Sequence, residues 1–392
     1  MTTLLLSGLA VTAAVSASLT AAVIPLLRRA RAIDVPGDRS LHRLPVPRGG
    51  GLAIVLSASL ATWTAVLAAV HQRGAVHAMT GLDVALMGLA TVLAFALLGL
   101  SEDLFSVSVR TRLVLQLALG AGLGLVAHSA FEVSLWWTPA ICVGTAALVN
   151  ATNFMDGANG LACSHALMTS LWYVQVAIVA PVPGLGLVMV SVAGACLGFL
   201  PFNTPRAKVF LGDSGSYALG GAWAFAVTAC LARGVAVEAA LAPVLVLLAD
   251  TGYTLWMRLR AGQCWYESHR LHVYQRLVCA GWPHWASALL VTLAAASCSA
   301  LAAGSLLTGS RLHHGRDNGL RHCRKVHVQS LSAIRTGTTH RITAFRRNRK
   351  HTMAFATSYM IFHHSLFSAE QDRRGQGKRA FHLPDTVYPL QN

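Results

Sequence analysis

Long apolar stretches, separated by short polar segments, divide most of the first 310 residues of the chain. These stretches cover about residues 4–27, 50–70, 83–101, 113–130, 135–151, 161–180, 184–202, 216–232, 239–257 and 286–308. A helix needs roughly 20 apolar residues to cross the hydrocarbon core of a bilayer, so each stretch predicts one membrane-spanning helix. We therefore expect an all-α fold, a polytopic integral membrane bundle of about 10 transmembrane helices.

The composition agrees with this pattern and excludes a soluble domain. Of the 392 residues, 54% are hydrophobic and only 12% are charged, whereas a soluble globular domain carries about 25% charged residues. The 8 cysteines occur singly, without the C-x-x-C spacing of a zinc or redox site. We expect most of them to act as small apolar side chains inside the spans.

Basic residues are distributed unevenly along the chain. The formal net charge is +16, and residues 311–392 contribute +11 of it. Because the excess lies in the last fifth of the chain, the total charge does not indicate that the whole protein binds nucleic acid, and we expect no nucleic-acid partner. The composition predicts two parts: a membrane core at 1–310, and a basic tail at 311–392 that is either disordered or altered by a reading-frame shift near residue 310.

The basic residues of the loops predict the orientation of the core. The loop after the first span is the densest in arginine, with Arg28, Arg29, Arg31, Arg39, Arg43 and Arg48. Positively charged loops stay in the cytoplasm, so we expect the N-terminus outside and the loops at 102–112, 152–160, 203–215 and 258–285 inside. The acidic and histidine side chains of these loops then share the cytoplasmic face. Carboxylates next to hydrocarbon indicate function, so we expect cytoplasmic catalytic loops at the membrane surface.

Two polar segments carry charges next to the ends of predicted spans. In the first, Arg39, His42 and Arg48 lie in a loop rich in proline and glycine. This combination suits an anionic lipid head group, and the alternative is a simple cytoplasmic anchor. In the second, the adjacent Glu102 and Asp103 end a span. Neighbouring carboxylates raise the pKa of one acid or share a cation; the alternative is a pair of solvated loop acids.

Two further segments combine carboxylates with amides or a lysine. Asn150, Asn153 and Asp156 are spaced three residues apart, so they share one face at the end of a predicted helix and suit a hard cation or a nucleotide. Asp213 lies at the start of another span, shortly after Lys208. A carboxylate beside a phosphate-binding helix N-terminus is typical of a magnesium site, although Asp213 alone would also suit an ordinary helix cap.

The longest predicted cytoplasmic loop places two histidines and an arginine on one helical face. His269, His272 and Arg276 follow i, i+3, i+7 spacing. Two histidines without a third protein ligand make a poor structural zinc site, whereas histidine beside arginine suits a diphosphate. The alternative interpretation is a polar amphipathic helix without a ligand.

Taken in order, these segments resemble one enzyme family. The matching pieces are DVPGDRSLHRLPVPRGGGLAI, GLSEDLFSVSVRTRL, NATNFMDGANGLA, NTPRAKVFLGDSGSYALG and ESHRLHVYQRL. They are similar to the polyprenyl-phosphate N-acetylhexosamine-1-phosphate transferases, the MraY-, WecA- and WbpL-like glycosyltransferase family 4. The HRLHVYQR stretch looks closest to the WbpL-like, O-antigen-initiating branch. The family usually has Asp-Asp where this chain has Glu102-Asp103, and a second Asp where this chain has Asn159.

The resemblance implies a reaction and the residues that carry it. The expected enzyme transfers an N-acetylhexosamine-1-phosphate from a UDP-N-acetylhexosamine to undecaprenyl phosphate and releases UMP. It would use Mg²⁺, or Mn²⁺, at the bacterial cytoplasmic membrane and start an O-antigen or another cell-envelope polysaccharide. The implied catalytic residues are Asp103, Glu102, Asp156 and Asp213. Asp213 and Asp156 would hold the metal, and Asp103 with Glu102 would orient or deprotonate the lipid phosphate.

The resemblance also implies the substrate-binding residues. Asn150 and Asn153 would contact substrate, Lys208, His269, His272 and Arg276 would bind the diphosphate of the sugar nucleotide, and Arg39, His42 and Arg48 would hold the lipid phosphate. The rival class is a membrane transporter of an anionic solute. A transporter should carry polar residues near the centres of its spans. The predicted span centres are nearly bare of such residues, which favours the enzyme.

Overall fold

The computed structural model describes residues 2–37, 41–42, 44–73, 75–180, 182–264 and 270–322, together with Ala354, Ser358, Tyr359 and Ile361. Its helices are α1 (Thr2–Arg29), α2 (Gly51–Arg73), α3 (Ala75–Phe105), α4 (Val109–Phe131), α5 (Thr138–Phe154), α6 (Leu161–Val179), α7 (Leu185–Asn203), α8 (Gly212–Ala232), α9 (Val237–Leu241), α10 (Leu245–Arg260), α11 (Val273–Cys279) and α12 (His284–His322). The other described elements are two 3₁₀ turns, η1 (Leu135–Trp137) and η2 (Ala242–Val244), and two short antiparallel strands, β1 (Ile33–Asp34) and β2 (Val46–Pro47).

Within the described residues, 9 helical segments are long and apolar enough to cross a membrane. They coincide with nine of the predicted spans, so the all-α polytopic bundle is confirmed. The remaining span, predicted at 135–151, corresponds to α5, which has 17 residues. At 1.5 Å per residue α5 is about 26 Å long, slightly shorter than a hydrocarbon core of about 30 Å. Trp136 and Trp137 precede it and are largely exposed, as is typical of the membrane–water interface.

Helix α8 lies at the centre of the bundle. It packs against α3 and α5, and almost all of its side chains are buried. Small residues allow this close packing, because a Cβ at Gly220 would overlap Val149 of α5 and one at Gly221 would overlap Phe95 of α3. Helix α8 is therefore held closely between α3 and α5.

The predicted span at 239–257 is a broken helix rather than a continuous one. The η2 turn, which contains Pro243, separates α9 from α10. Three side chains of α6 donate hydrogen bonds to carbonyl groups at the break: Trp172 to Ala239 (2.8 Å), Tyr173 to Ala240 (2.8 Å) and His165 to Pro243 (2.9 Å). Unpaired backbone groups are costly in hydrocarbon, so these bonds stabilise the break and fix the start of α10.

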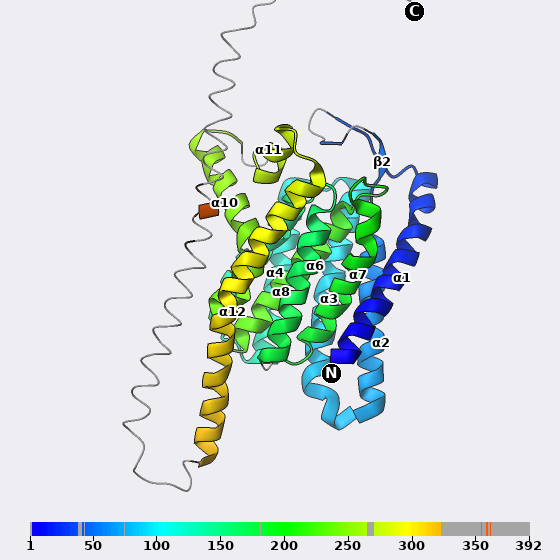
Figure 1. Ribbon diagram of the computed structural model, residues 1–392. Helices are drawn as coiled ribbons and strands as arrows, with labels where there is room; N and C mark the ends of the chain where they lie inside the picture. Colours follow the sequence, from blue (N-terminus) through cyan, green and yellow to red (C-terminus); the bar gives the residue numbers. More distant parts are fainter. Residues whose placement is uncertain are drawn as a thin grey trace, which may run out of the picture.

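The polar loops gather at one end of the bundle. Figure 1 shows β2, α11 and the C-terminal end of α1 together at that end, while the start of α1, the end of α2 and the start of α3 lie at the opposite end. Hydrogen bonds join the ends of α3, α5 and α8 there. The described residues of the loops that were predicted to share one face therefore do share it. That this face is the cytoplasmic one stays a prediction.

Helix α12 crosses the predicted boundary between core and tail at residue 310. It continues to His322, and its last turns extend beyond the far end of the bundle (Figure 1). Tyr359 is 7% exposed and belongs to the apolar core. Most of residues 311–392 lie outside the described part of the chain, so the division at 310 and the disordered or altered tail stay predictions.

Candidate active site

Backbone hydrogen bonds join the first polar loop to the segment before α8. The amides of Gly50 and Gly51 donate to the carbonyls of Phe210 (2.9 Å) and Leu211 (2.7 Å). A Cβ at Gly51 would overlap the backbone of α8, so only glycine allows the two segments to approach this closely. The glycine run therefore serves a contact within the chain, and this contact places Arg48 beside the first turn of α8.

Arg48 joins the carboxylates of Asp103 and Asp213. Its Nε lies 3.2 Å from Asp103 Oδ1, and its Nη2 lies 2.9 Å from Asp213 Oδ2. Asp103 also accepts hydrogen bonds from the backbone amides of Asp213 (3.0 Å) and Ser214 (2.9 Å). It thereby caps α8, where free N–H groups and the helix dipole favour a carboxylate. Burial alone would lower the pKa of Arg48, but the charges of Asp213, Asp103 and Asp34 outweigh burial and raise it.

The end of α5 holds Asp213 from a second side. The side-chain amide of Asn153 donates to Asp213 Oδ1 (2.8 Å) and to Ser216 Oγ (3.0 Å). Because Oδ2 of Asp213 is paired with Arg48, both of its carboxylate oxygens have partners. The carboxylate is therefore oriented by the protein itself.

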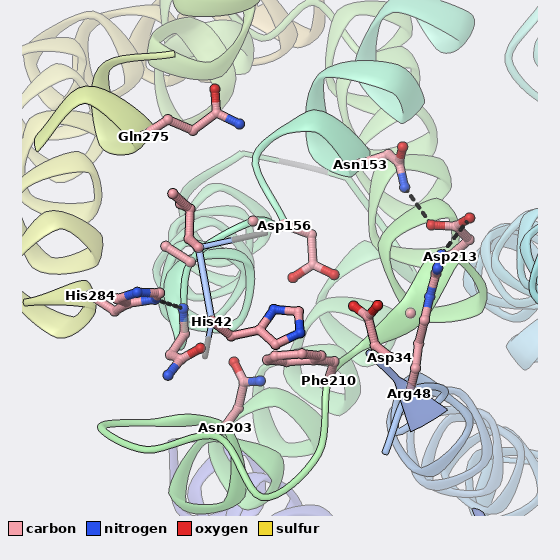
Figure 2. A pocket seen from close by; sticks show the side chains of 15 residues that line it. Asp34, His42, Arg48, Asn153, Asp156, Asn203, Phe210, Asp213, Gln275 and His284 are labelled. Carbon is pink, nitrogen blue, oxygen red and sulfur yellow. Dashed lines mark hydrogen bonds and ion pairs between the residues drawn. The ribbon is translucent and has the colours of Figure 1, made fainter. Parts of the chain in front are cut away.

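A cavity of about 280 Å³ opens beside these residues. It is lined by Asp34, Leu41, His42, Arg48, Asn153, Asp156, Gly157, Ala158, Asn159, Asn203, Phe210, Gly212, Asp213, Gln275 and His284. Figure 2 shows Asp213, Arg48 and Asp34 on one side of the cavity, with His284 on the other. The lining thus combines acidic, basic and amide groups from polar segments along the whole membrane core, which is the composition of a binding site rather than of a packing defect.

Asp156 lies in the loop after α5 and points into the cavity (Figure 2). Among the described residues its carboxylate has no hydrogen-bond or ion-pair partner. Burial raises the pKa of Asp156 well above its usual value, and repulsion by Asp213 raises it further. A nearby cation favours the ionised form of such a group. The position of Asp156 therefore suits a positively charged ligand.

Histidine and aromatic side chains form another part of the cavity wall. The His42 ring packs edge-on against Phe210 with 4.9 Å between ring centroids, and its Nε2 is buried with no hydrogen-bond partner in the described part of the chain. His284, at the start of α12, accepts a hydrogen bond at Nδ1 from the Asn159 amide (3.2 Å). This bond ties the loop that carries Asp156 to α12.

The structure brings some of the predicted site residues to the cavity and places others elsewhere. Those that line the cavity are His42, Arg48, Asn153, Asp156 and Asp213, and Asp103 contacts two of them. Those outside it are Glu102, paired with Arg112 (3.0 Å); Asn150, bonded to Gln116; and Lys208, exposed with its Nζ 5.8 Å from the Phe202 ring centre. Asn150 and Asn153 share a helix face but contact different helices.

The described residues of the predicted histidine and arginine face, His272 and Arg276, do not line the cavity. His272 is 2% exposed, and its Nδ1 is bonded to Asp250 of α10. Arg276 is buried, at 5% exposure. Of the described residues in this segment, Gln275 lines the cavity. Arg39 and His269, the remaining predicted site residues, lie outside the described residues.

Several residues of the site were missed in the sequence-based set. They are Asp34, Asn203, Phe210, Gln275 and His284, which line the cavity, and Asp250, which binds His272. Asn203 and Phe210 belong to the same polar segment as Asp213. Their closeness to Asp213 in the sequence could have indicated that they line the same site. Asp250 lies inside a predicted span, and an acid in such a position is itself a functional signal. The residues next to His284 in the sequence do not indicate that it belongs to a site. His284 reaches the cavity only because packing places the start of α12 beside the loop that carries Asn159.

The oxygen donors at one end of the cavity fit a hard divalent cation. Asp156 and Asp213 offer carboxylates, and Asn153 offers an amide oxygen. Magnesium typically takes one or two protein carboxylates and leaves its other positions to water and phosphate. The described residues contain no group of three or more His, Cys, Asp or Glu side chains that could hold a metal, so they form no closed site of the zinc type.

Known proteins similar to this chain are phosphotransferases. Residues 85–231 match the family model described as glycosyl transferase family 4. The chain is 30% identical over 303 residues to decaprenyl-phosphate N-acetylglucosaminephosphotransferase of Mycobacterium leprae, covering 68% of this chain and 75% of that protein. It is 31% identical over 237 residues to phospho-N-acetylmuramoyl-pentapeptide-transferase of Desulforudis audaxviator, covering 51% and 68%. It is 26% identical over 292 residues to a protein of Bacillus subtilis named as a probable undecaprenyl-phosphate N-acetylglucosaminyl 1-phosphate transferase, covering 69% and 77%.

These matches and the apolar helices confirm the expected family and the multi-pass bacterial membrane protein. The matched range contains Asp103, Asn153, Asp156 and Asp213, the acidic end of the site. Placement in the WbpL-like branch stays a prediction. The chain belongs to glycosyl transferase family 4, and within it to the polyprenyl-phosphate N-acetylhexosamine phosphotransferases, enzymes that make lipid-linked sugar phosphates.

Proposed function

We propose that this enzyme transfers an N-acetylhexosamine-1-phosphate from a UDP-N-acetylhexosamine to undecaprenyl phosphate and releases UMP. The names of two relatives support the parts of this reaction, since one contains decaprenyl phosphate and N-acetylglucosamine and the other contains undecaprenyl phosphate. N-Acetylglucosamine is therefore the first sugar to test. The product would be the first lipid-linked sugar of an O-antigen or of another cell-envelope polysaccharide.

One observation carries the proposal: the unpaired carboxylate of Asp156 lines the same cavity as the oriented carboxylate of Asp213 and the guanidinium of Arg48. Phosphoryl transfer requires alignment of the nucleophile and positive charge beside the transferred phosphate. Asp156 and Asp213 would hold Mg²⁺, or Mn²⁺, at this end of the cavity. When bound, the metal would neutralise charge on the diphosphate of the donor.

Arg48 and His42 are the groups of the cavity that suit a phosphate. The Arg48 side chain is 41% exposed, so its guanidinium keeps a face toward the cavity while it bridges two acids. The Nε2 of His42 has no partner among the described residues and suits an acceptor oxygen of phosphate or sugar. Lys208 and Arg276, which were expected to bind the diphosphate, do not line the cavity. We therefore assign the phosphate contacts to Arg48 and His42.

We assign Asp103 a positioning role rather than removal of a proton from the lipid phosphate. Its Oδ1 accepts from the Asp213 amide and faces Arg48, and its Oδ2 accepts from the Ser214 amide. Both oxygens are thus already used to hold α8 and Arg48 in place. A lipid phosphate is already ionised at neutral pH, so its alignment matters more than a strong base.

The test is release of UMP by the purified full-length protein with undecaprenyl phosphate, Mg²⁺ and a panel of UDP-sugars. We expect release with at least one UDP-N-acetylhexosamine, and we expect it to require both the lipid phosphate and the divalent cation. Arg206→Ala is the matched control, because Arg206 is an exposed cation of the loop before α8 that does not line the cavity. Release of UMP without lipid phosphate, or no release with any sugar, would contradict the proposal.

The orientation of the site is a second part of the proposal. The arginine-rich loop before β2 supports a cytoplasmic site and an external N-terminus. Single cysteines placed at 104–109, on a background without native cysteines, should be protected in intact cells from a reagent that cannot cross the membrane. Labelling of these positions from outside would reverse the orientation.

A further inference from the structure

Asp250 is a buried carboxylate in α10. None of the residues that line the cavity is its neighbour in the sequence. Its side chain is 0% exposed. One oxygen is bonded to His272 Nδ1, and the other accepts a hydrogen bond from the Val273 amide (3.0 Å). Asp250 therefore caps α11 and binds the residue that precedes it. Burial of a carboxylate is costly unless hydrogen bonds and charge compensate for its lost hydration. The bonds to His272 and to the Val273 amide provide this compensation. Because both bonds are made at the first turn of α11, they fix where that helix begins.

Helix α11 in turn contacts the loop that carries Asp156. The Tyr274 hydroxyl donates to the carbonyl of Phe154, the last residue of α5 (2.9 Å). A Cβ at Gly157 would overlap the same hydroxyl. The His272 ring stacks on both Phe154 and Tyr274, with ring centroids 6.1 Å and 6.0 Å apart. The contacts of α11 thus lie on both sides of Asp156 in the chain.

The orientation of Asp156 depends on these backbone contacts. Asp213 is oriented through its own carboxylate oxygens by Arg48 and Asn153. Asp156 has no such partner among the described residues, so the direction of its side chain follows the position of its loop. Tyr274 is 1% exposed and well packed, which makes it a rigid support for that loop.

We infer that Asp250 is a positioning residue, which acts through His272 and Tyr274 to fix the loop that carries Asp156. The kinetic consequence of this inference rests on the proposed function, because only that function makes Asp156 a ligand of the reaction centre. The contacts themselves can be tested without any substrate. Neither Asp250 nor Tyr274 lines the cavity, so neither needs to touch a substrate for the effect.

The first experiment measures amide hydrogen exchange in the full-length protein without substrate. Three amides of the loop are hydrogen-bonded and report on its order: Asp156 to Asn153 O (3.1 Å), Asn159 to His284 and Gly160 to Asn203. We expect Asp250→Asn and Tyr274→Phe to speed exchange of these amides about tenfold or more, because opening the loop becomes easier. Exchange in α8 should stay unchanged.

Asp83→Asn is the matched control. Asp83 is an exposed acid of the same span as Asp103, and 20 residues of helix place it about 30 Å from the cavity end. Its variant should exchange like the wild type. Unchanged exchange at residues 154–160 in both Asp250→Asn and Tyr274→Phe would overturn the inference. Faster exchange throughout the bundle would also overturn it, because the role would then be general stability.

The second experiment measures UMP release. We expect Asp250→Asn and Tyr274→Phe to lower kcat about 10- to 100-fold, as removal of an outer orienting partner commonly does, with the KM for the UDP-sugar close to wild type. The double variant should be no worse than the poorer single variant, since both act through one path. Additive losses would contradict a shared path. An inactive wild type would overturn the proposed function instead, and would leave the exchange result standing.

Discussion

Asp213 and Asp156 line the same cavity, but the protein surrounds them in opposite ways. Asp213 has a partner at each oxygen, from Asn153 and Arg48, and its backbone amide is bonded to Asp103. Asp156 has no partner for its carboxylate among the described residues, and burial raises its pKa. One acid is therefore fixed in advance by side chains, and the other is left for a ligand. Such a site is preorganised on one side and open to a cation on the other.

The largest effect is expected from removal of either charge. Asp213→Asn and Asp156→Asn should each lower UMP release per inserted protein by about 1,000-fold or more, because loss of a metal-centred contact costs several kcal/mol in the transition state. The two variants should differ in stability, since only Asp213→Asn disturbs the contact with Arg48. Turnover near the wild-type level in either variant at saturating Mg²⁺ would remove that acid from the site.

Arg48 variants test whether the preorganised side requires an arginine. Arg48→Ala should lower kcat about 100-fold and Arg48→Lys about tenfold, because lysine presents one point charge where the arginine fork reaches both Asp103 and Asp213. Steady-state kinetics with the UDP-sugar and with the lipid phosphate varied separately will measure this. Equal losses in the two variants would show that the fork geometry is unimportant.

Asp156→Asn is expected to have a smaller effect, on stability. The direction of the change in apparent Tm distinguishes Asp156 from an acid that is stabilised by an ion pair. Because burial raises the folded-state pKa of Asp156 above its unfolded value, the folded protein binds that proton more tightly. The ionised group therefore lowers stability at alkaline pH, and stability is regained as the pH falls through the raised pKa. Asp156→Asn should raise the apparent Tm at alkaline pH without divalent cation, and this difference should shrink as the pH falls.

Mg²⁺ provides the matched test of the same effect. The cation should raise the apparent Tm of the wild type but not of Asp156→Asn, since a ligand stabilises only the state that binds it. A variant less stable than the wild type at alkaline pH would show that Asp156 has a stabilising partner after all.

The smallest effect is expected from Asp103→Asn. An asparagine keeps one oxygen for a backbone amide of α8 but loses the charge that faces Arg48. A weakened helix cap costs about 1 kcal/mol, so the apparent Tm should fall by a few degrees while part of the activity remains. Complete loss of activity with an unchanged Tm would instead support a direct role for Asp103 at the lipid phosphate.

Local patterns were sufficient to predict the architecture and to select Asp156 and Asp213, which line the candidate site. The length of each apolar run is a property of neighbouring residues, so the runs at 4–27 and 286–308 and those between them indicated spans without any tertiary information. Asp156 and Asp213 stood out in the same way, because each is a carboxylate at the end of a predicted span, next to hydrocarbon. The family resemblance rested on these contiguous segments, and the comparisons confirm it.

The directions of the side chains were decided only by packing. Asn150 and Asn153 have the spacing of a shared face, yet Asn150 bonds Gln116 of α4 and Asn153 bonds Asp213 of α8. His272 has the composition of a phosphate contact, yet it is buried against Asp250. In each case the partner comes from another helix, 22, 34 or 60 residues away in the sequence. Spacing along one helix reports which residues share a face, but the identity of the neighbour on that face follows from how the helices pack in three dimensions.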